Sequence, residues 1–274
     1  MALPNVLILA GHDPTGGAGI IADAEAVRAM GGWPLTVPTA LTRQSTVDVQ
    51  AVMPCPASEM LATAQTLVED CEPAAIKVGL IADSEMLDAV IGLCERYRHL
   101  PIVIDPVLKA GGGRELSGKA LEAAFVKRLL PLATLVTPNL VELERLAGHA
   151  NKGTMTTVDA QAELLLGAGA HAVLATGTDV AGAQASDDII HRLYVDAQYR
   201  QWSWPRLTGS YHGSGCTLAS AAATRLAFGS TIEQACVEAQ RFTWQSLLSA
   251  HHPGRGQYVP DRWTPAAARA EHRK

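Results

Sequence analysis

Cys216 lies in the stretch YHGSGCTLAS (211–220), between a glycine-flanked turn and an alanine-rich run that predicts a helix. The consecutive backbone N–H groups from Gly213 to Cys216 would then stand at a helix start, where they can bind an anion such as a phosphate group. A thiol at this position is expected to have a lowered pKa, because the helix dipole favours the thiolate. Cys216 is therefore a candidate base beside an anion site. The predicted catalytic residues of this turn are Gly213, Ser214, Gly215 and Cys216.

Two other roles for this cysteine fail on spacing. The nucleophile elbow of a hydrolase needs glycines two residues before and two residues after the nucleophile, where this chain has Ser214 and Leu218. A metal ligand would need further cysteine or histidine partners, but His212 stands four residues away without a second pair at ligand spacing. Inert packing stays open as the alternative for Cys216, and it is the role that we expect for Cys94 and Cys236 on apolar helices.

Polar side chains follow several apolar runs, at the positions where predicted strands end. Gln44, Asp105 and Asn139 stand there, and because the carboxyl ends of parallel strands share one edge of a sheet, we expect them to converge. Asn139 and Glu142, three residues apart in PNLVE, can offer two oxygen ligands to a hydrated Mg²⁺ ion, although an N-cap with a first-turn acid explains the same pair. Beside an anion site, the metal interpretation is favoured. The amide of Gln44 matches an amino-substituted nitrogen heterocycle, which indicates a base-like substrate.

The glycines of GHDPTGGAGIIAD (11–23) do not form a dinucleotide-binding motif. GAGIIA fits the loose form of that fingerprint, but its first glycine lies seven residues beyond Ala10, and no acidic residue ends the second strand to bind a ribose. The phosphate loop G-x-x-x-x-G-K-[ST] is absent from the sequence as well. We interpret the glycines as allowing a flat ligand to approach the backbone. Asp23 could contact that ligand, or stand in solvent as a first-turn charge.

The composition narrows the class of partner. A length of 274 residues, a formal net charge of −5, 48% hydrophobic and 18% charged residues describe an ordinary globular protein without a basic face for nucleic acid or anionic membranes. Five cysteines without a C-x-x-C pair argue against a disulfide framework and a zinc knuckle. The N-terminal apolar run ends after about six residues, too short for a signal peptide or a membrane span. We expect a cytoplasmic protein with a small-molecule partner.

Short apolar, β-branched runs alternate with segments of helical periodicity. The runs predict buried parallel strands, and the alternation predicts an α/β fold: a three-layer α/β/α sandwich with a mostly parallel central sheet. The stretches 187–196 and 198–205 alternate apolar and polar residues more than the parallel-strand runs do. This pattern predicts an antiparallel pair of strands at the edge of the sheet. The predicted parallel strands are 5–10, 34–40, 75–80, 101–105, 133–137 and 172–176.

The C-terminal part of the chain predicts two helices, near 216–228 and 232–250. No linker, repeat or charge run divides the sequence before them. We therefore expect a single domain over residues 1–250, followed by a loosely packed tail over 251–274.

With these residues gathered, the chain resembles the hydroxymethylpyrimidine and phosphomethylpyrimidine kinases of thiamine biosynthesis, within the ribokinase-like superfamily. The resemblance covers roughly residues 4–250 and implies a ribokinase-like fold, use of ATP and Mg²⁺, and a homodimer. The motifs that carry it, in family order and spacing, are AGHDPTGGAGIIAD, TALTRQST, IKVGL, VIDPV, LVTPNLVELERLAG and HGSGCTLASA.

The resemblance also implies a reaction and roles for single residues. ATP would phosphorylate the hydroxymethyl group of 4-amino-5-hydroxymethyl-2-methylpyrimidine, and a second ATP would convert the monophosphate to the pyrophosphate. Cys216 would be the base, where most ribokinase-like kinases have an aspartate. A pyridoxal kinase and a noncatalytic vitamin-precursor binding protein are the alternatives. The implied residues are Gln44, Asp23, Gly11, Ala18, Leu80 and Val107 for the substrate, Asn139, Glu142, Thr208 and Lys109 for the nucleotide, and Asp105 and Glu142 for Mg²⁺.

Two phosphate-facing lysines that are usual in the family are missing from this chain. Gly111 and Thr176 stand in their places, and Lys109 or Arg114 could substitute for one of them. The first phosphorylation starts from an uncharged alcohol. The second must hold an anionic substrate, so it depends more on these charges.

Overall fold

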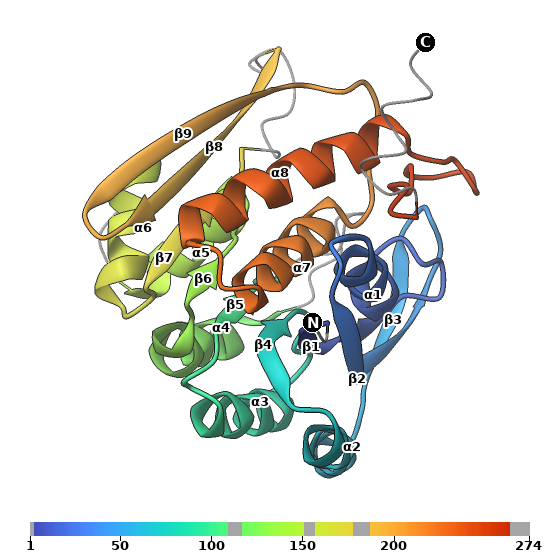
Figure 1. Cartoon of the computed structure of the whole chain (residues 1–274), viewed down its shortest axis with the longest axis vertical. Coiled ribbons are helices and arrows are strands. Elements are labelled where there is room, and N and C mark those ends of the chain that lie inside the picture. Colours follow the sequence, from blue (N-terminus) through green and yellow to red (C-terminus); the bar gives the residue numbers. More distant parts are fainter. Residues whose placement is uncertain (1–2, 109–116, 151–156, 178–186, 264–274) are drawn as a thin grey trace.

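The computed structural model describes residues 3–108, 117–150, 157–177 and 187–263. In this part of the chain, nine strands form one sheet in the order β3-β2-β1-β4-β5-β6-β7-β8-β9 (Figure 1). The strands are β1 (Asn5–His12), β2 (Trp33–Gln44), β3 (Val49–Pro54), β4 (Pro73–Val78), β5 (Ile102–Ile104), β6 (Leu135–Val136), β7 (Ala172–Ala175), β8 (Asp188–Val195) and β9 (Gln198–Pro205).

The centre of the sheet is parallel and its edges are antiparallel. β2, β1, β4, β5, β6 and β7 run in one direction, which confirms the six predicted parallel strands. β8 and β9 pair antiparallel with each other, as the sequence predicted for this edge. β8 also pairs antiparallel with β7, which was not predicted. The other edge was not predicted: β3 pairs antiparallel with β2 and extends the sheet by one strand.

Helices cover both faces of the sheet (Figure 1). On one face α1 (Gly19–Ala29) packs against α7 (Ser214–Ala227), which packs against α8 (Ile232–Leu248). The two predicted C-terminal helices are thus confirmed to within two residues at each end. The opposite face carries α2 (Ala57–Asp70), α3 (Ser84–Arg96), α4 (Lys119–Ala124) with the π turn Phe125–Leu129 and the 3-10 turn Leu130–Leu132, α5 (Leu140–Ala150) and α6 (Val158–Gly167).

β1 shows why the fold has three layers. Leu7 and Leu9 belong to the core under α2, α3, α5 and α6, whereas Val6, Ile8 and Ala10 belong to the core under α1, α7 and α8. All five side chains are buried, as a central parallel strand with helices on both faces requires. The predicted three-layer α/β/α sandwich is confirmed.

The prediction of a loose C-terminal tail from His251 onward is wrong for residues 251–263. The backbone of this segment pairs with itself at His251 and Val259, and with the loop before α7 at Tyr258. Arg262 is 1% exposed, so this segment packs as part of the domain. The rest of the predicted tail, 264–274, lies outside the described residues.

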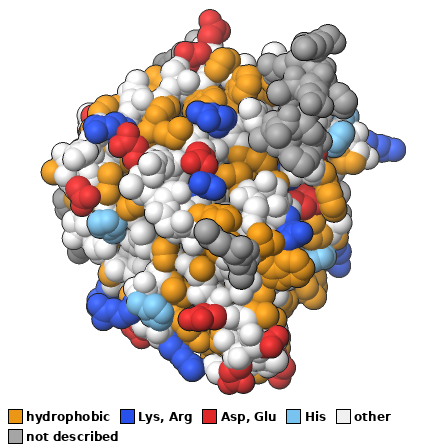
Figure 2. All heavy atoms as spheres, viewed as in Figure 1, with side chains coloured by type: hydrophobic (Ala, Val, Ile, Leu, Met, Phe, Trp, Pro, Cys, Tyr) orange, Lys and Arg blue, Asp and Glu red, His pale blue; other side chains and the backbone are white. Residues whose placement is uncertain are grey.

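The surface carries charges of both signs. On the face shown in Figure 2, Lys and Arg side chains lie singly among acidic and apolar ones. Among the helices that the structure describes, none combines the length and the apolar character needed to cross a bilayer.

Candidate active site

One cavity of about 620 Å³ lies at the carboxyl ends of the parallel strands. The last residue of β2, Gln44, and the first-turn residue Cys216 of α7 both line it. Strand ends and helix N-termini meet at such an edge because every parallel strand is followed by a loop on the same side of the sheet. The convergence expected from the sequence is therefore present.

Most of the site residues that the sequence indicated line this cavity. Asp23 and Thr208 do not, and Lys109, like Gly111 and Arg114, lies outside the described residues. The residues that do line it are Gly11, Ala18, Gln44, Leu80, Asp105, Val107, Asn139, Glu142, Gly213, Ser214, Gly215 and Cys216. Thr176, which replaces a lysine usual in the family, lines it as well.

Thr208 is exposed on the loop after β9. Its carbonyl accepts a hydrogen bond from the hydroxyl of Tyr211 at 2.9 Å, which shapes the loop that leads to α7. Its neighbours Leu207 and Gly209 line the cavity, so the nucleotide contact of Thr208 stays a prediction.

Asp23 lies behind the cavity wall, which corrects its expected contact with a substrate. Its side chain is fully buried, with Oδ2 2.9 Å from Nζ of Lys77, while Oδ1 accepts a hydrogen bond from Ser220 Oγ at 2.7 Å. Because Asp23 is fully buried and does not line the cavity, it is not placed to contact a ligand there. Asp23 instead holds Lys77, which does line the cavity.

Lys77 is a functional candidate that was not predicted from the sequence. It is 0% exposed on β4, and Nζ also lies 3.8 Å from Oδ2 of Asp105. Burial opposes its charge, but Asp23, Cys216 and Asp105 raise the pKa of Lys77, so it stays an ammonium. A signal was present: Lys77 stands between Ile76 and Val78 in an apolar strand, and a lysine is buried there only when it is paired.

The Cys216 thiol does not have the lowered pKa expected for a helix start. Burial raises the pKa of Cys216 strongly, Asp105 and Asp23 add to the rise, and Lys77 opposes it. The pKa of Asp105 is also raised by burial, although Lys77 and a hydrogen bond from the Cys216 thiol oppose the rise. The resting site therefore holds a thiol that donates toward a carboxylate, with an ammonium beside both.

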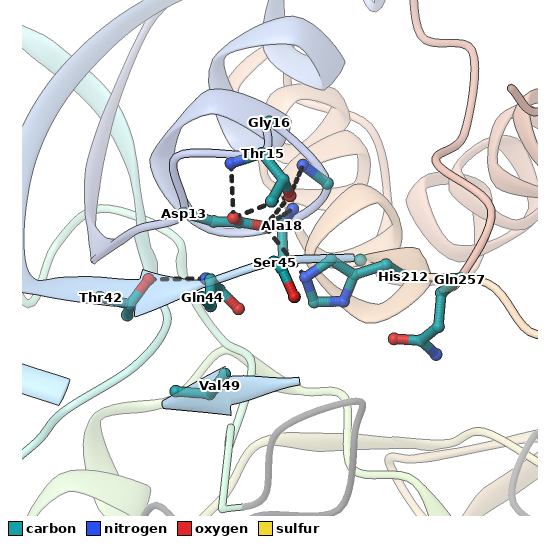
Figure 3. A network of polar contacts seen from close by, with 12 residues as sticks. Asp13, Thr15, Gly16, Ala18, Thr42, Gln44, Ser45, Val49, His212 and Gln257 are labelled. Atoms are coloured by element: carbon teal, nitrogen blue, oxygen red, sulfur yellow. Dashed lines mark hydrogen bonds and ion pairs between the residues drawn. The ribbon is translucent and has the colours of Figure 1, made fainter. Parts of the chain in front are cut away.

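A second polar network orders the loop before α1 (Figure 3). Asp13 Oδ1 accepts a hydrogen bond from the backbone N–H of Thr15 at 2.8 Å, and Oδ2 accepts one from the N–H of Ala18 at 2.8 Å. Oδ2 also lies 2.9 Å from Nε2 of His212, on the loop before α7. Burial opposes ionisation of Asp13, but hydrogen bonds from His212 and Thr15 outweigh it and lower its pKa. This carboxylate fastens the two glycine loops together.

Gly213 allows these loops to close. It has a φ of 71°, and a Cβ on it would lie 1.9 Å from the carbonyl oxygen of Gly17. Any side chain would separate the loops and carry the start of α7 away from the cavity. Residues Gly213 to Cys216 all line the cavity, so the first-turn N–H groups of α7 can meet an anion there.

Asn139 and Glu142 form reciprocal hydrogen bonds at the start of α5. The N–H of Glu142 donates to Asn139 Oδ1 at 2.8 Å, and the N–H of Asn139 donates to Glu142 Oε2 at 3.0 Å. The helix-capping alternative that the sequence left open is thus present, which does not exclude a metal contact, because both residues also line the cavity.

The carboxylates at the cavity do not form a closed metal site. Within the described part of the chain, no three His, Cys, Asp or Glu side chains cluster as a metal centre. Oδ2 of Asp105 is buried without a hydrogen-bond donor. Asp105 and Glu142 fit an ion such as Mg²⁺, which keeps several waters and takes further ligands from phosphates.

Comparison with known proteins agrees with this geometry. A family model described as phosphomethylpyrimidine kinase matches residues 13–261. The hydroxymethylpyrimidine/phosphomethylpyrimidine kinase of Rhizobium meliloti is 34% identical over 253 residues, which cover 92% of this chain and 93% of that protein. The thiamine biosynthesis bifunctional protein ThiED of Geobacter sulfurreducens is 35% identical over 253 residues, and here the chain spans 51% of the relative's length.

Solved structures give the same picture. The pyridoxal kinase of Staphylococcus aureus, solved with pyridoxal and with AMP-PCP, superposes with a TM-score of 0.83 at 26% identity, covering 96% of this chain and 94% of that one. The architecture is therefore ribokinase-like. On the family model and the identity to the Rhizobium kinase, the chain belongs to the phosphomethylpyrimidine kinase family.

Proposed function

We propose that this chain transfers the γ-phosphoryl group of ATP to the hydroxymethyl group of 4-amino-5-hydroxymethyl-2-methylpyrimidine, and that it phosphorylates the resulting monophosphate in a second step. One observation carries the proposal: Gln44, suited to an aminopyrimidine, and Cys216, at the anion-binding start of α7, line the same cavity. The nucleotide-analogue complex of the similar pyridoxal kinase supports ATP as the donor.

The orientation of Gln44 favours an amino-substituted ring. Thr42 Oγ1 donates its proton to the carbonyl of His12 at 2.9 Å, so the same oxygen accepts the hydrogen bond from Gln44 Nε2 at 2.7 Å (Figure 3). Gln44 therefore presents Oε1 as an acceptor. An exocyclic amino group of the pyrimidine would donate to it, whereas pyridoxal has no such group.

Cys216 and its neighbours can handle the proton of the reacting hydroxyl. As the O–P bond forms and the bond to ADP breaks, the hydroxyl proton passes to Cys216 Sγ, and the thiol's own proton passes to the Asp105 carboxylate. Proton removal occurs late in phosphoryl transfer, so a thiol of raised pKa suffices for this role. Lys77 stays beside Asp23 and Asp105 and offsets one of their two negative charges.

Two groups of residues would stabilise the negative charge of the phosphates. The first-turn N–H groups of α7 face the transferred group, and Asp105 and Glu142 would hold Mg²⁺, largely through water. When bound, Mg²⁺ lowers the cost of bringing the phosphate charges together.

Product analysis tests the proposal. The purified protein is incubated with ATP, Mg²⁺ and hydroxymethylpyrimidine to completion, and the products are identified by phosphorus NMR and mass spectrometry. We expect the monophosphate, followed by the pyrophosphate. Ligand binding without any phosphorylated product would support a noncatalytic binding protein, and accumulation of the monophosphate alone would exclude the second step.

Pyridoxal kinase activity is the second candidate, and the structural similarity to the Staphylococcus aureus pyridoxal kinase favours it. The same assay with pyridoxal separates the two. A larger kcat/KM for pyridoxal than for hydroxymethylpyrimidine would reverse the assignment.

A further inference from the structure

The segment after α8 runs back to the cavity, where it contacts both the turn between β2 and β3 and the loop before α7. We call residues 251–263 the C-terminal strap. The N–H of Gln257 donates to the carbonyl of Thr46 at 2.8 Å, on the turn between β2 and β3, and the N–H of His212 donates to the carbonyl of Tyr258 at 2.8 Å. Gln257 itself lines the cavity, close to His212 (Figure 3). The strap therefore bridges the substrate side and the anion side of the site.

Arg262 anchors the end of this strap. Its side chain is 0% exposed. Nε donates to Thr217 Oγ1 at 2.7 Å, and the terminal nitrogens donate to the carbonyls of Gly17 at 2.6 Å and Gly16 at 3.3 Å. Glu25 on α1 lies 3.2 Å away and balances the charge. One guanidinium thus holds the glycine loop, α1 and α7.

Thr217 links Arg262 to the turn that begins α7. Thr217 Oγ1 accepts from Arg262 and donates to the carbonyl of Gly213 at 2.8 Å. Gly213 in turn packs on Gly17, whose carbonyl is the other main acceptor of Arg262. Arg262 therefore holds the two backbones that meet at the anion site, in addition to the Asp13 contacts that join the same loops.

We propose that Arg262 is a positioning residue that sets the geometry of the anion-binding turn at Gly213–Cys216, acting through Thr217 and Gly17. This inference rests on the proposed kinase function for its kinetic consequence. Arg262 does not line the cavity, so it contacts no substrate. A lysine would keep the charge but lose the planar fork that reaches several acceptors at once.

The test compares Arg262→Lys with Arg225→Lys. Arg225 lies near the other end of α7, where its Nε is 2.8 Å from Glu238 Oε2, and it does not line the cavity. For Arg262→Lys we expect kcat to fall about 10²-fold while KM for hydroxymethylpyrimidine changes less than about threefold, because the misplaced turn affects the transferred phosphoryl group rather than the pyrimidine. Arg225→Lys should keep both constants, with circular dichroism confirming that both variants fold.

Hydrogen exchange gives a readout that needs no substrate. The backbone N–H of Ala18 donates to Asp13 Oδ2 in the loop before α1, and that of Thr217 donates to the carbonyl of Gly213 in the first turn of α7. They should exchange about tenfold faster in Arg262→Lys and at the wild-type rate in Arg225→Lys. If the wild-type protein phosphorylates neither hydroxymethylpyrimidine nor pyridoxal, the proposed function fails. The exchange rates would still show whether Arg262 positions the turn at Gly213–Cys216.

Thr217 provides the second pair of variants, which also covers a failure of Arg262→Lys to fold. Thr217→Val removes the hydroxyl between Arg262 and Gly213, and Thr217→Ser keeps it. We expect kcat to fall in the valine variant and to be largely retained in the serine variant. Equal kcat in these two variants, or wild-type kcat and exchange in Arg262→Lys, would overturn the proposal.

Discussion

Replacing Lys77 by methionine removes the ammonium between two buried carboxylates. Asp23 is 0% and Asp105 5% exposed, and the charge of Lys77 is their shared partner, at 2.9 and 3.8 Å. Removing one member of a buried ion pair costs about 3–5 kcal/mol, because the remaining charge is left uncompensated. For a chain of this size we expect Tm to fall by roughly 6–20 °C. The exposed Lys127→Met is the matched control, expected within about 0.5 kcal/mol of wild type.

The stability lost in Lys77→Met should increase as the pH rises. In wild type the pKa of Lys77 is raised, so its contribution is fully present at every pH below its ordinary pKa of 10.5. In Lys77→Met the pKa of Asp105, already raised by burial, rises further. A carboxyl group with a raised folded pKa stabilises the fold at low pH and loses that contribution as pH rises through the folded pKa. The variant should therefore be closer to wild type at pH 5 than at pH 8.

Urea unfolding at both pH values measures these effects. The double variant Lys77→Met/Asp23→Asn should recover part of the loss, since it removes one of the stranded charges. A loss below about 1 kcal/mol in Lys77→Met, or an equal loss at pH 5 and pH 8, would refute the electrostatic account of this cluster.

Three further predictions concern the cavity wall. Cys216→Ala should lower kcat by about 10²–10⁴-fold with KM for hydroxymethylpyrimidine nearly unchanged, as measured by steady-state kinetics; unchanged kcat would make the thiol a packing group. Gly213→Ala should abolish activity, because its Cβ would lie 1.9 Å from the Gly17 carbonyl oxygen, whereas Gly229→Ala, with a φ of 81° and nothing within 4 Å, should remain active despite backbone strain. Gln44→Leu should raise KM for hydroxymethylpyrimidine about tenfold and leave KM for pyridoxal nearly unchanged, and equal changes for both alcohols would contradict the amide contact.

The central layers of the fold could be predicted because their signal is local. A parallel strand buried on both faces, such as β1, is a continuous apolar run in the sequence. The parallel strands beside it show the same pattern. β3 escaped prediction because it is a short edge strand, largely exposed beyond Val49, whose place depends on the turn from β2. The buried end of the strap escaped because an arginine at position 262 has no local feature that indicates burial.

The site was predictable where strand ends define it and unpredictable where distant side chains pair. Gln44 and Cys216 follow from the rule that parallel strands share one edge. The Asp13–His212 contact joins residues 199 apart in the chain, and Lys77 lies 54 residues from Asp23. The raised pKa of the thiol depends on how deeply the first turn of α7 is buried, which no short motif encodes. The homodimer and the cytoplasmic location stay predictions.

A crystal structure of the protein with hydroxymethylpyrimidine would show whether the substrate lies between Gln44 and Cys216. We expect the pyrimidine in the cavity with its exocyclic amino group on Gln44 Oε1 and its hydroxymethyl oxygen within hydrogen-bonding distance of Cys216 Sγ. A pyrimidine bound elsewhere, or one whose hydroxymethyl group points away from the start of α7, would contradict this arrangement.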